Sequence, residues 1–201
     1  MNKSVCIIIT NEFGEKDFTA LKKSEFKVFF FPMIKTISEH YVLNDDNYEF
    51  LVFTSKNGIR YFFDSNKKID QFRSKKIICL GTKTEEFLHQ YKLKSFFTSP
   101  KSYSKIMLNH IIERGFINGK KTLLVQGNLA SDELLDGFKK ISNVKRINSY
   151  RTELITTNNQ ELEKIIKIYN SYCVFTSPSS FQAFDINYNP SLTNIVSIGT
   201  T

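Results

Sequence analysis

The sequence predicts an α/β fold in which parallel sheets are flanked by helices. Three observations predict it: the chain repeats itself, strand patterns alternate with helical patterns, and the apolar runs are continuous. Strands that alternate with helices form parallel sheets through right-handed crossovers. Continuous apolar runs are typical of strands buried on both faces of such a sheet. We therefore expect two similar α/β units.

The internal repeat is clearest around two Phe-Thr-Ser segments. Phe50–Phe63 resembles Tyr172–Phe184, because each contains an apolar strand, the letters FTS and an amphipathic helix. In both copies a second strand follows and ends in Gly-Thr, at Ile77–Thr82 and at Ile195–Thr200. This shared order indicates a duplicated unit.

The repeat extends upstream of both segments. Val5–Thr36 reads strand, turn, helix, strand, and Thr122–Leu154 reads the same way. An extended stretch then precedes each FTS strand, so the expected module is β-α-β, linker, α-β-α-β. Capping residues and apolar residues at helical spacing predict the further elements. These are helices at Thr84–Tyr91, Lys105–Arg114, Ser131–Phe138 and Asn158–Asn170, and a short strand near Phe96–Phe97.

The second copy ends earlier than the first. The first copy continues beyond Gly81 and Thr82 into a helix and a short strand, whereas the second stops at Thr201. The duplication therefore predicts a chain that is truncated at its C-terminus or whose second unit is incomplete.

The net charge of +8 comes from 28 Lys and Arg residues against 20 Asp and Glu residues. The basic residues lie in short pairs, such as Lys120–Lys121 and Lys139–Lys140, and form no long stripe. A solvated surface is expected, with neither nucleic acid nor a membrane as partner. No apolar stretch approaches the length of about 18 residues that a membrane span needs.

Each of the three cysteines, Cys6, Cys79 and Cys173, lies in a β-branched apolar run. A small thiol in such a run packs as a core residue. The spacing suggests neither a metal site nor a disulfide framework, which fits a reducing cytoplasm.

Taken together, the motifs resemble those of the uroporphyrinogen-III synthase family over about residues 3–201. No single motif is specific, and the resemblance depends on their order. In chain order they are FTSKNGIRYF, LGTKT, LLVQGNLASDELL, INSYRT, VFTSPSSFQAF and IGTT.

The resemblance implies two interleaved domains joined by two extended linkers. The first domain would comprise residues 1–33 and 152–201, the second residues 34–151, with linkers near Phe31–Thr36 and Ile147–Thr152. It also implies a lyase of haem biosynthesis, a cytoplasmic monomer without metal or cofactor. The substrate would be hydroxymethylbilane, a carboxylate-rich linear tetrapyrrole. In a cleft between the domains it would close to uroporphyrinogen III, with loss of water and inversion of the D ring.

The resemblance also implies a set of site residues. Tyr150, in SYRT, matches the linker tyrosine that donates a hydrogen bond to the departing hydroxyl, a role that a weakly acidic phenol suits. The substrate-binding positions lie on the turns that follow strands. They are Thr54, Ser55, Gly81, Thr82, Thr84, Gly127, Asn128, Thr176, Ser177, Ser179, Thr200 and Thr201.

Purely structural roles compete with these assignments. Tyr150 suits a ring packed against a linker, Thr54 and Thr176 suit helix N-caps, and Gly81 and Gly199 suit tight turns. The three histidines, His40, His89 and His110, lie on expected surface helices without a carboxylate or Cys partner at motif spacing. Neither a Ser-His-Asp arrangement nor a Gly-rich phosphate loop is present in the sequence.

Two other functions remain open on the sequence alone. A two-domain, hinge-closing protein would bind an anionic small molecule without turning it over, and the lack of a strong acid–base pair favours it. A degenerate synthase, which folds poorly and has no activity, would follow from a missing C-terminal segment.

Overall fold

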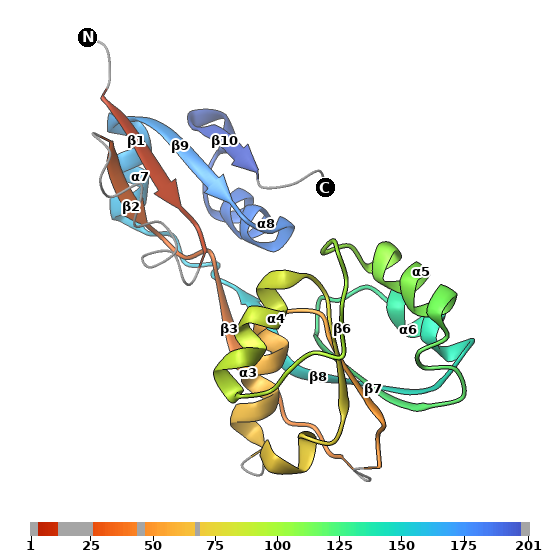
Figure 1. Ribbon diagram of the computed structural model, residues 1–201. Coiled ribbons are helices and arrows are strands. Elements are labelled where there is room, and N and C mark those ends of the chain that lie inside the picture. Colours follow the sequence, from red (N-terminus) through yellow and green to blue (C-terminus); the bar gives the residue numbers. More distant parts are fainter. Residues whose placement is uncertain (1–3, 12–25, 44–46, 67–68, 198–201) are drawn as a thin grey trace. The chain divides into compact units, whose positions relative to one another are not determined.

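The computed structural model describes residues 4–11, 26–43, 47–66 and 69–197 (Figure 1). The chain divides into two compact units. The terminal unit is Met1–Lys35 with Glu153–Thr201, and the central unit is Thr36–Thr152. The sequence-based expectation divides the chain after residues 33 and 151.

The central unit is built on the six-stranded sheet, whose strand order is β3-β8-β7-β4-β5-β6. The pairs β8–β7, β7–β4, β4–β5 and β5–β6 are parallel, as expected from the continuous apolar runs. The strands are β3 (Ile34–Ser38), β4 (Phe50–Phe53), β5 (Lys76–Cys79), β6 (Phe97–Thr98), β7 (Lys121–Gly127) and β8 (Asn143–Leu154).

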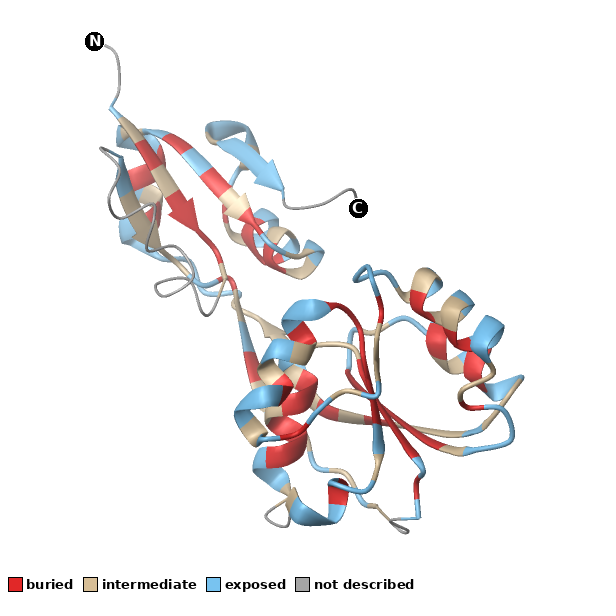
Figure 2. Cartoon of the chain, in the orientation of Figure 1, coloured by how far each residue is buried: buried red, intermediate tan, exposed pale blue. Residues whose placement is uncertain are grey.

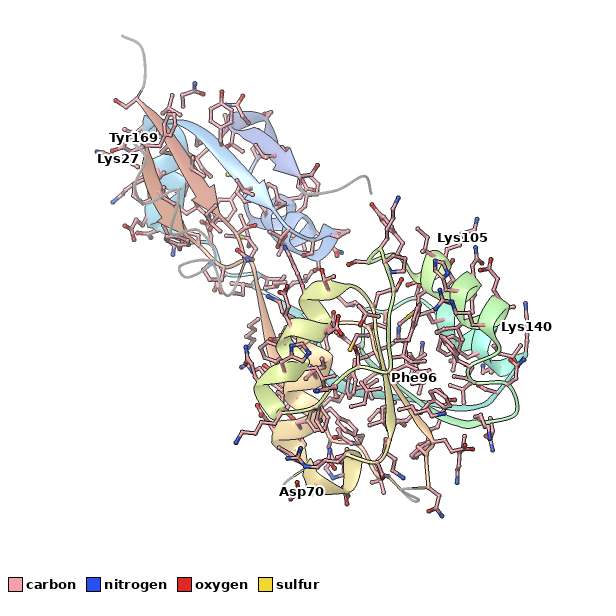
Figure 3. The ribbon with its side chains drawn as sticks, viewed as in Figure 1. Lys27, Asp70, Phe96, Lys105, Lys140 and Tyr169 are labelled. Carbon is pink, nitrogen blue, oxygen red and sulfur yellow. The ribbon has the colours of Figure 1, made fainter. Side chains whose placement is uncertain are left out.

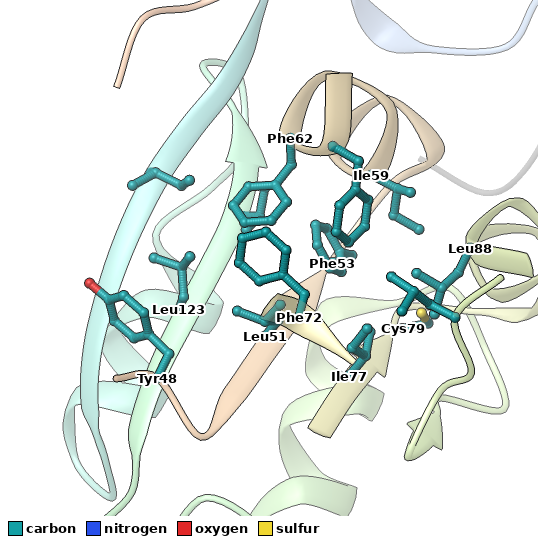
Figure 4. Close-up of a cluster of buried hydrophobic side chains, with 14 residues drawn as sticks. Tyr48, Leu51, Phe53, Ile59, Phe62, Phe72, Ile77, Cys79, Leu88 and Leu123 are labelled. Atoms are coloured by element: carbon teal, nitrogen blue, oxygen red, sulfur yellow. The ribbon is translucent and has the colours of Figure 1, made fainter. Parts of the chain in front are cut away.

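Helices cover both faces of this sheet. On one face, α3 (Lys56–Ser65) and α4 (Thr82–Leu88) enclose a core rich in aromatic rings, which Figure 4 shows. Phe53 and Phe62 meet there edge to face, with ring centroids 5.4 Å apart. On the other face, α5 (Ser104–Arg114) and α6 (Glu133–Lys139) pack over a second core. In Figure 2 the buried residues of both cores lie on the strands and on the helix sides that face them.

The terminal unit has a four-stranded sheet in the order β10-β9-β1-β2, and all its pairs are parallel. Its core combines residues of β1 and β9 with residues of α7 and α8. The elements are β1 (Val5–Ile9), β2 (Lys27–Phe30), α7 (Gln160–Ile168), β9 (Asn170–Phe175), α8 (Pro178–Asn187) and β10 (Asn194–Ser197). The helix expected between the first two strands lies outside the described residues.

Short 3-10 helices complete the described elements: η1 (Ile69–Phe72), η2 (His89–Tyr91) and η3 (Pro190–Leu192).

The duplication is visible at the two FTS segments, but the capping residue differs from the expected one. Thr54 and Thr176 are the N-cap candidates by sequence, whereas the following serines cap the helices. Ser55 Oγ accepts a hydrogen bond from Gly58 N at 3.0 Å and begins α3. Ser177 Oγ accepts one from Ser180 N at 3.2 Å and begins α8. Both serines have the extended backbone that an N-cap requires.

The expected linkers fall within β3 and β8, and here one strand pair departs from the parallel pattern. Glu39 N donates to Ser149 O, and Ile155 N donates to Met33 O. The residue just after β3 thus bonds to the middle of β8, and the residue just after β8 bonds to the residue just before β3, so these strands are antiparallel. The reason is topological, because one strand leads into the central unit and the other leads out of it.

The module also predicts a helix between the first linker and the strand at Phe50, and this prediction is wrong for the described residues 39–43 and 47–49. Aromatic anchors hold this segment in an irregular path. The Tyr41 ring stacks on Phe62 at 6.0 Å, and Tyr48 is buried in the core. His40 therefore does not lie on a helix, whereas His110 lies on α5 and His89 begins η2.

The cysteines and the surface charges lie where the sequence predicts them. Cys6, Cys79 and Cys173 are buried free thiols, and burial raises the pKa of Cys79 to about 12. Basic side chains are distributed over the surface, and Figure 3 labels Lys105 on α5 and Lys140 just after α6. Within the described part of the chain, no helix is long and apolar enough to cross a membrane.

Candidate active site

Tyr150 lies in β8, and its ring packs directly against the backbone of Gly127 at the end of β7. A Cβ added at Gly127 would lie 2.5 Å from Tyr150 Cζ and 2.9 Å from the Tyr150 hydroxyl oxygen. Those distances are shorter than any normal carbon contact, so glycine is required for this approach. The backbone of one strand therefore forms the surface on which the phenol ring rests.

A local irregularity in the sheet directs the Tyr150 ring. Gln126 pairs with Asn148, but the next residue, Gly127, pairs with Tyr150 instead of Ser149. An extra residue of this kind changes the side-chain alternation of a strand. Ser149 Oγ donates to the backbone oxygen of the third residue of α3, and the neighbouring Tyr150 ring packs on Tyr61 of α3. Two consecutive side chains of β8 thus lie on the same side of the sheet.

The Tyr150 hydroxyl contacts the capping serine of α3. Its oxygen lies 3.1 Å from Ser55 Oγ, and either hydroxyl can donate this hydrogen bond. Because Ser55 Oγ already accepts from Gly58 N, the helix N-terminus fixes the position of the serine and thereby of the phenol.

Tyr61, on α3, holds the Tyr150 ring from the side. The two rings are nearly parallel, with centroids 5.7 Å apart and an interplanar angle of 22°. Tyr61 is itself fixed, because its hydroxyl donates to Thr36 O at 2.6 Å. The Tyr150 ring is therefore held between Gly127, Ser55 and Tyr61.

The pKa of the Tyr150 hydroxyl is raised above its ordinary value. Burial is the main cause, and the neighbouring Tyr61 raises it further, while the hydrogen bond with Ser55 lowers it. A raised pKa keeps the phenol protonated at neutral pH. The group can therefore donate a hydrogen bond to an oxygen without itself carrying charge.

Asn128 holds the turn that follows β7. Its Oδ1 accepts from Thr152 N at 2.8 Å, and its backbone N donates to Tyr150 O at 3.3 Å. The two bonds join the turn to β8 on either side of Arg151. The Asn128 side chain thus stabilises the strand that carries Tyr150.

The strand end at Gly81 supplies a second group of expected residues. Gly81 has φ +83°, a left-handed value that favours glycine, and a Cβ there would clash with Ser102 Oγ. Thr82 is exposed at the start of α4. Thr84 is buried, and its hydroxyl donates to Leu80 O at 3.0 Å, so it is engaged within the fold.

The remaining expected residues belong to the terminal unit. Ser177 Oγ lies 3.0 Å from Ser179 Oγ at the start of α8, and Thr176 beside them is exposed. Thr200 and Thr201, and Gly199 before them, lie outside the described residues. Within the central unit, the structure brings together Tyr150, Ser55, Gly127 and Asn128.

Sequence reasoning missed two residues near this group. Tyr61 supports the Tyr150 ring, and its place on the amphipathic helix after FTS was the available signal. Gln126 directly precedes Gly127 and is buried at 3% exposure, although its side chain is polar. The sequence feature that could have indicated this residue is a glutamine at the end of an apolar strand. Among the described residues, no group of three His, Cys, Asp or Glu side chains could hold a metal ion.

Comparison with known sequences identifies the family. Residues 16–201 match the family described as Uroporphyrinogen-III synthase HemD. The chain belongs to this family. Over 152 residues it is 31% identical to the porphyrin biosynthesis protein HemD of Ruminiclostridium josui. That match covers 72% of this chain but 30% of the relative, so the chain spans under a third of that protein's length.

Solved structures of uroporphyrinogen-III synthases share the fold of this family member. The enzyme of Helicobacter pylori is 18% identical, with a TM-score of 0.69 over 99% of this chain and 84% of its own. A mutant of the Thermus thermophilus enzyme is 15% identical, with a TM-score of 0.66 over 98% of this chain and 85% of its own. These likenesses support the two-sheet α/β architecture.

Proposed function

We propose that this chain is a uroporphyrinogen-III synthase, which cyclises hydroxymethylbilane to uroporphyrinogen III in tetrapyrrole biosynthesis. The proposal depends on one observation: in this member of the family, Gly127, Ser55 and Tyr61 hold the phenol of Tyr150 in place. Its raised pKa suits a neutral hydrogen-bond donor. We propose further that it acts as a monomer in the cytoplasm.

The first step breaks the bond between the terminal carbon of the substrate and its hydroxyl oxygen. The electron pair of that bond leaves with the oxygen, which takes up a proton and departs as water. The pyrrole that remains is a cation. Tyr150 would donate its hydrogen bond to the departing oxygen and so stabilise the charge that develops there.

The second step forms the ring. The substituted α-carbon of the last pyrrole attacks the methylene carbon of this cation and gives a spiro intermediate. The bond from that α-carbon to its original bridging carbon then breaks, and the unsubstituted α-carbon of the same ring bonds to the freed bridging carbon and loses its proton, so the ring is inverted on closure. Holding the chain folded is the main physical requirement of this step. Backbone N–H groups and hydroxyls at the strand ends would bind the carboxylates. The proposed contacts are Thr54, Ser55, Gly81, Thr82, Thr84, Gly127, Asn128, Thr176, Ser177, Ser179, Thr200 and Thr201.

The phenol's role is tested by Tyr150→Phe, with Tyr61→Phe as a matched control. Tyr150→Phe keeps the ring on Gly127 but removes the donor, so turnover of hydroxymethylbilane should fall about 100-fold or more. The melting temperature should stay close to that of the wild type, since one part-buried hydrogen bond is lost.

Tyr61→Phe removes a hydroxyl that donates to the backbone oxygen of Thr36, and it keeps the ring that packs on Tyr150. This variant should lose some stability but retain most of the turnover. Wild-type turnover in Tyr150→Phe, measured under the same conditions, would contradict the assigned role.

A further inference from the structure

Three polar side chains form a row across the carboxyl end of the central sheet. We call Asn148, Gln126 and Thr54 the polar row. Gln126 pairs with Asn148 between β7 and β8. Phe53 pairs with Val125, which places Thr54, the next residue, opposite Gln126. Asn148 and Gln126 therefore lie side by side on neighbouring strands, and Thr54 directly follows the end of the next strand, β4.

The polar row lies on the face of the sheet that α5 and α6 cover. Val52 and Leu124 pair with each other and belong to the core beneath these helices. Because side chains two residues apart on a strand share a face, Thr54 and Gln126 project to the same side. The polar row thus lies where that apolar core ends, at the carboxyl end of the strands. The next pair along β7 and β8 is Gly127 with Tyr150.

Gln126 is buried without a hydrogen-bond partner. Its exposed fraction is 3%, and its Oε1 has no solvent contact and no partner among the described residues. In the same described part of the chain, the side chains of Thr54 and Asn148 form no hydrogen bond either. A buried carbonyl without a donor destabilises a folded protein, so its retention requires an explanation.

We propose that the polar row is a substrate subsite, in which Gln126 Oε1 accepts a hydrogen bond from a pyrrole N–H of the tetrapyrrole. The inference rests on the proposed function and adds a contact with a ring nitrogen to the proposed carboxylate contacts. Each pyrrole of the substrate carries an N–H donor. A neutral amide or hydroxyl can accept it without repelling the carboxylates nearby. Gly127 and Tyr150 follow directly along β7 and β8, with the Tyr150 ring on the face that α3 covers and the polar row on the face that α5 and α6 cover.

The test is Gln126→Met, which keeps the length of the side chain and removes its polar atoms. In the free protein the substitution removes the unpaired, buried carbonyl of Gln126, so the melting temperature should stay the same or rise. With substrate, one hydrogen bond is lost, so KM for hydroxymethylbilane should rise about threefold to tenfold. The rise in melting temperature that uroporphyrinogen III produces should shrink.

The matched control is Thr122→Val, on the same strand and the same face but at the amino end of β7. Thr122 is fully buried and its hydroxyl donates to Lys120 O at 3.4 Å. This variant should leave KM unchanged. Thr54→Val, a half-buried position, provides a second measurement and should also raise KM.

The outcomes separate the subsite from the proposed function. A lower melting temperature in Gln126→Met, with unchanged KM and ligand response, would show that the amide is satisfied inside the fold and would overturn the subsite. A wild type that makes no type III isomer but is stabilised by uroporphyrinogen III, less so in Gln126→Met, would refute the activity and support the subsite. A wild type with neither response would overturn both.

Discussion

The contact between Tyr150 and Gly127 shows how a glycine without unusual backbone angles can be required. Its φ is not in the left-handed region, where Gly81, Gly115 and Gly119 lie. The requirement comes from the phenol ring, which occupies the space of a Cβ. In the sequence, Gly-Asn after an apolar strand indicates a turn. The structure shows that the glycine is required because of Tyr150, a residue on another strand.

Gly127→Ala should displace the Tyr150 ring, because the new Cβ would lie 2.5 Å from Tyr150 Cζ. An aromatic ring is rigid, so the whole ring must move to relieve this contact. We expect a loss of stability of about 1–3 kcal/mol, as for other overpacked sites. Turnover should fall as well, since the phenol is moved from its position. Thermal melting and the rate of hydroxymethylbilane consumption measure the two effects.

Gly58→Ala is the control for this substitution. A Cβ at Gly58 would lie 3.4 Å from Ser55 Oγ and 3.5 Å from Val125 O, which are ordinary contacts. Alanine also favours a helix over glycine by about 1 kcal/mol. The melting temperature of Gly58→Ala should therefore not fall, and an equal loss in both variants would argue against the ring contact as the cause.

At the scale of elements, the duplicated FTS segments use serine in the same way. Ser55 begins α3 and Ser177 begins α8, each through the backbone N–H three residues later. The serine that ends each segment thus has a local role that requires no ligand. In the central unit the same serine also contacts Tyr150, which links helix capping to the phenol.

Replacing each serine by alanine should weaken only the helix that it caps. Hydrogen exchange should show a loss of protection of about 1 kcal/mol in α3 for Ser55→Ala and in α8 for Ser177→Ala. The other helix serves as the internal control in each experiment. Unchanged exchange in the capped helix would show that the bond to the backbone N–H does not stabilise it.

The elements that local patterns encode could be predicted from the sequence. The buried strands at Phe50–Phe53 and Lys121–Gly127 show continuous apolar runs, and α5 ends at Gly115 as its pattern predicts. The prediction of a helix before Phe50 was wrong, because Tyr41 and Tyr48 bind that segment to a core made by distant residues. Local periodicity does not report such contacts.

The site was predictable only in part, for the same reason. The family resemblance indicated Tyr150, Ser55 and Gly127, which the structure brings together. The support from Tyr61 and the unpaired Gln126 depend on the strand register and on the extra residue in β8. That irregularity turns Tyr150 toward α3, whereas strict alternation would place it and the preceding serine on opposite faces.

At the scale of the whole molecule, the duplication produces two units with unequal described architecture. The central unit has helices on both faces of its sheet, with a core on each side. In the terminal unit the described helices α7 and α8 share one core. The chain passes between the units twice, through β3 and β8, and the proposed phenol lies on the second of these strands.

The central claim is that this chain directs ring closure with inversion of the last pyrrole. The most direct measurement supplies the purified protein with hydroxymethylbilane, oxidises the products and separates the type I and type III isomers by chromatography. Without an enzyme the substrate closes to type I, so a synthase should give an excess of type III that grows with protein concentration. Type I alone, from a protein that melts cooperatively, would contradict the synthase and leave a binding protein in its place.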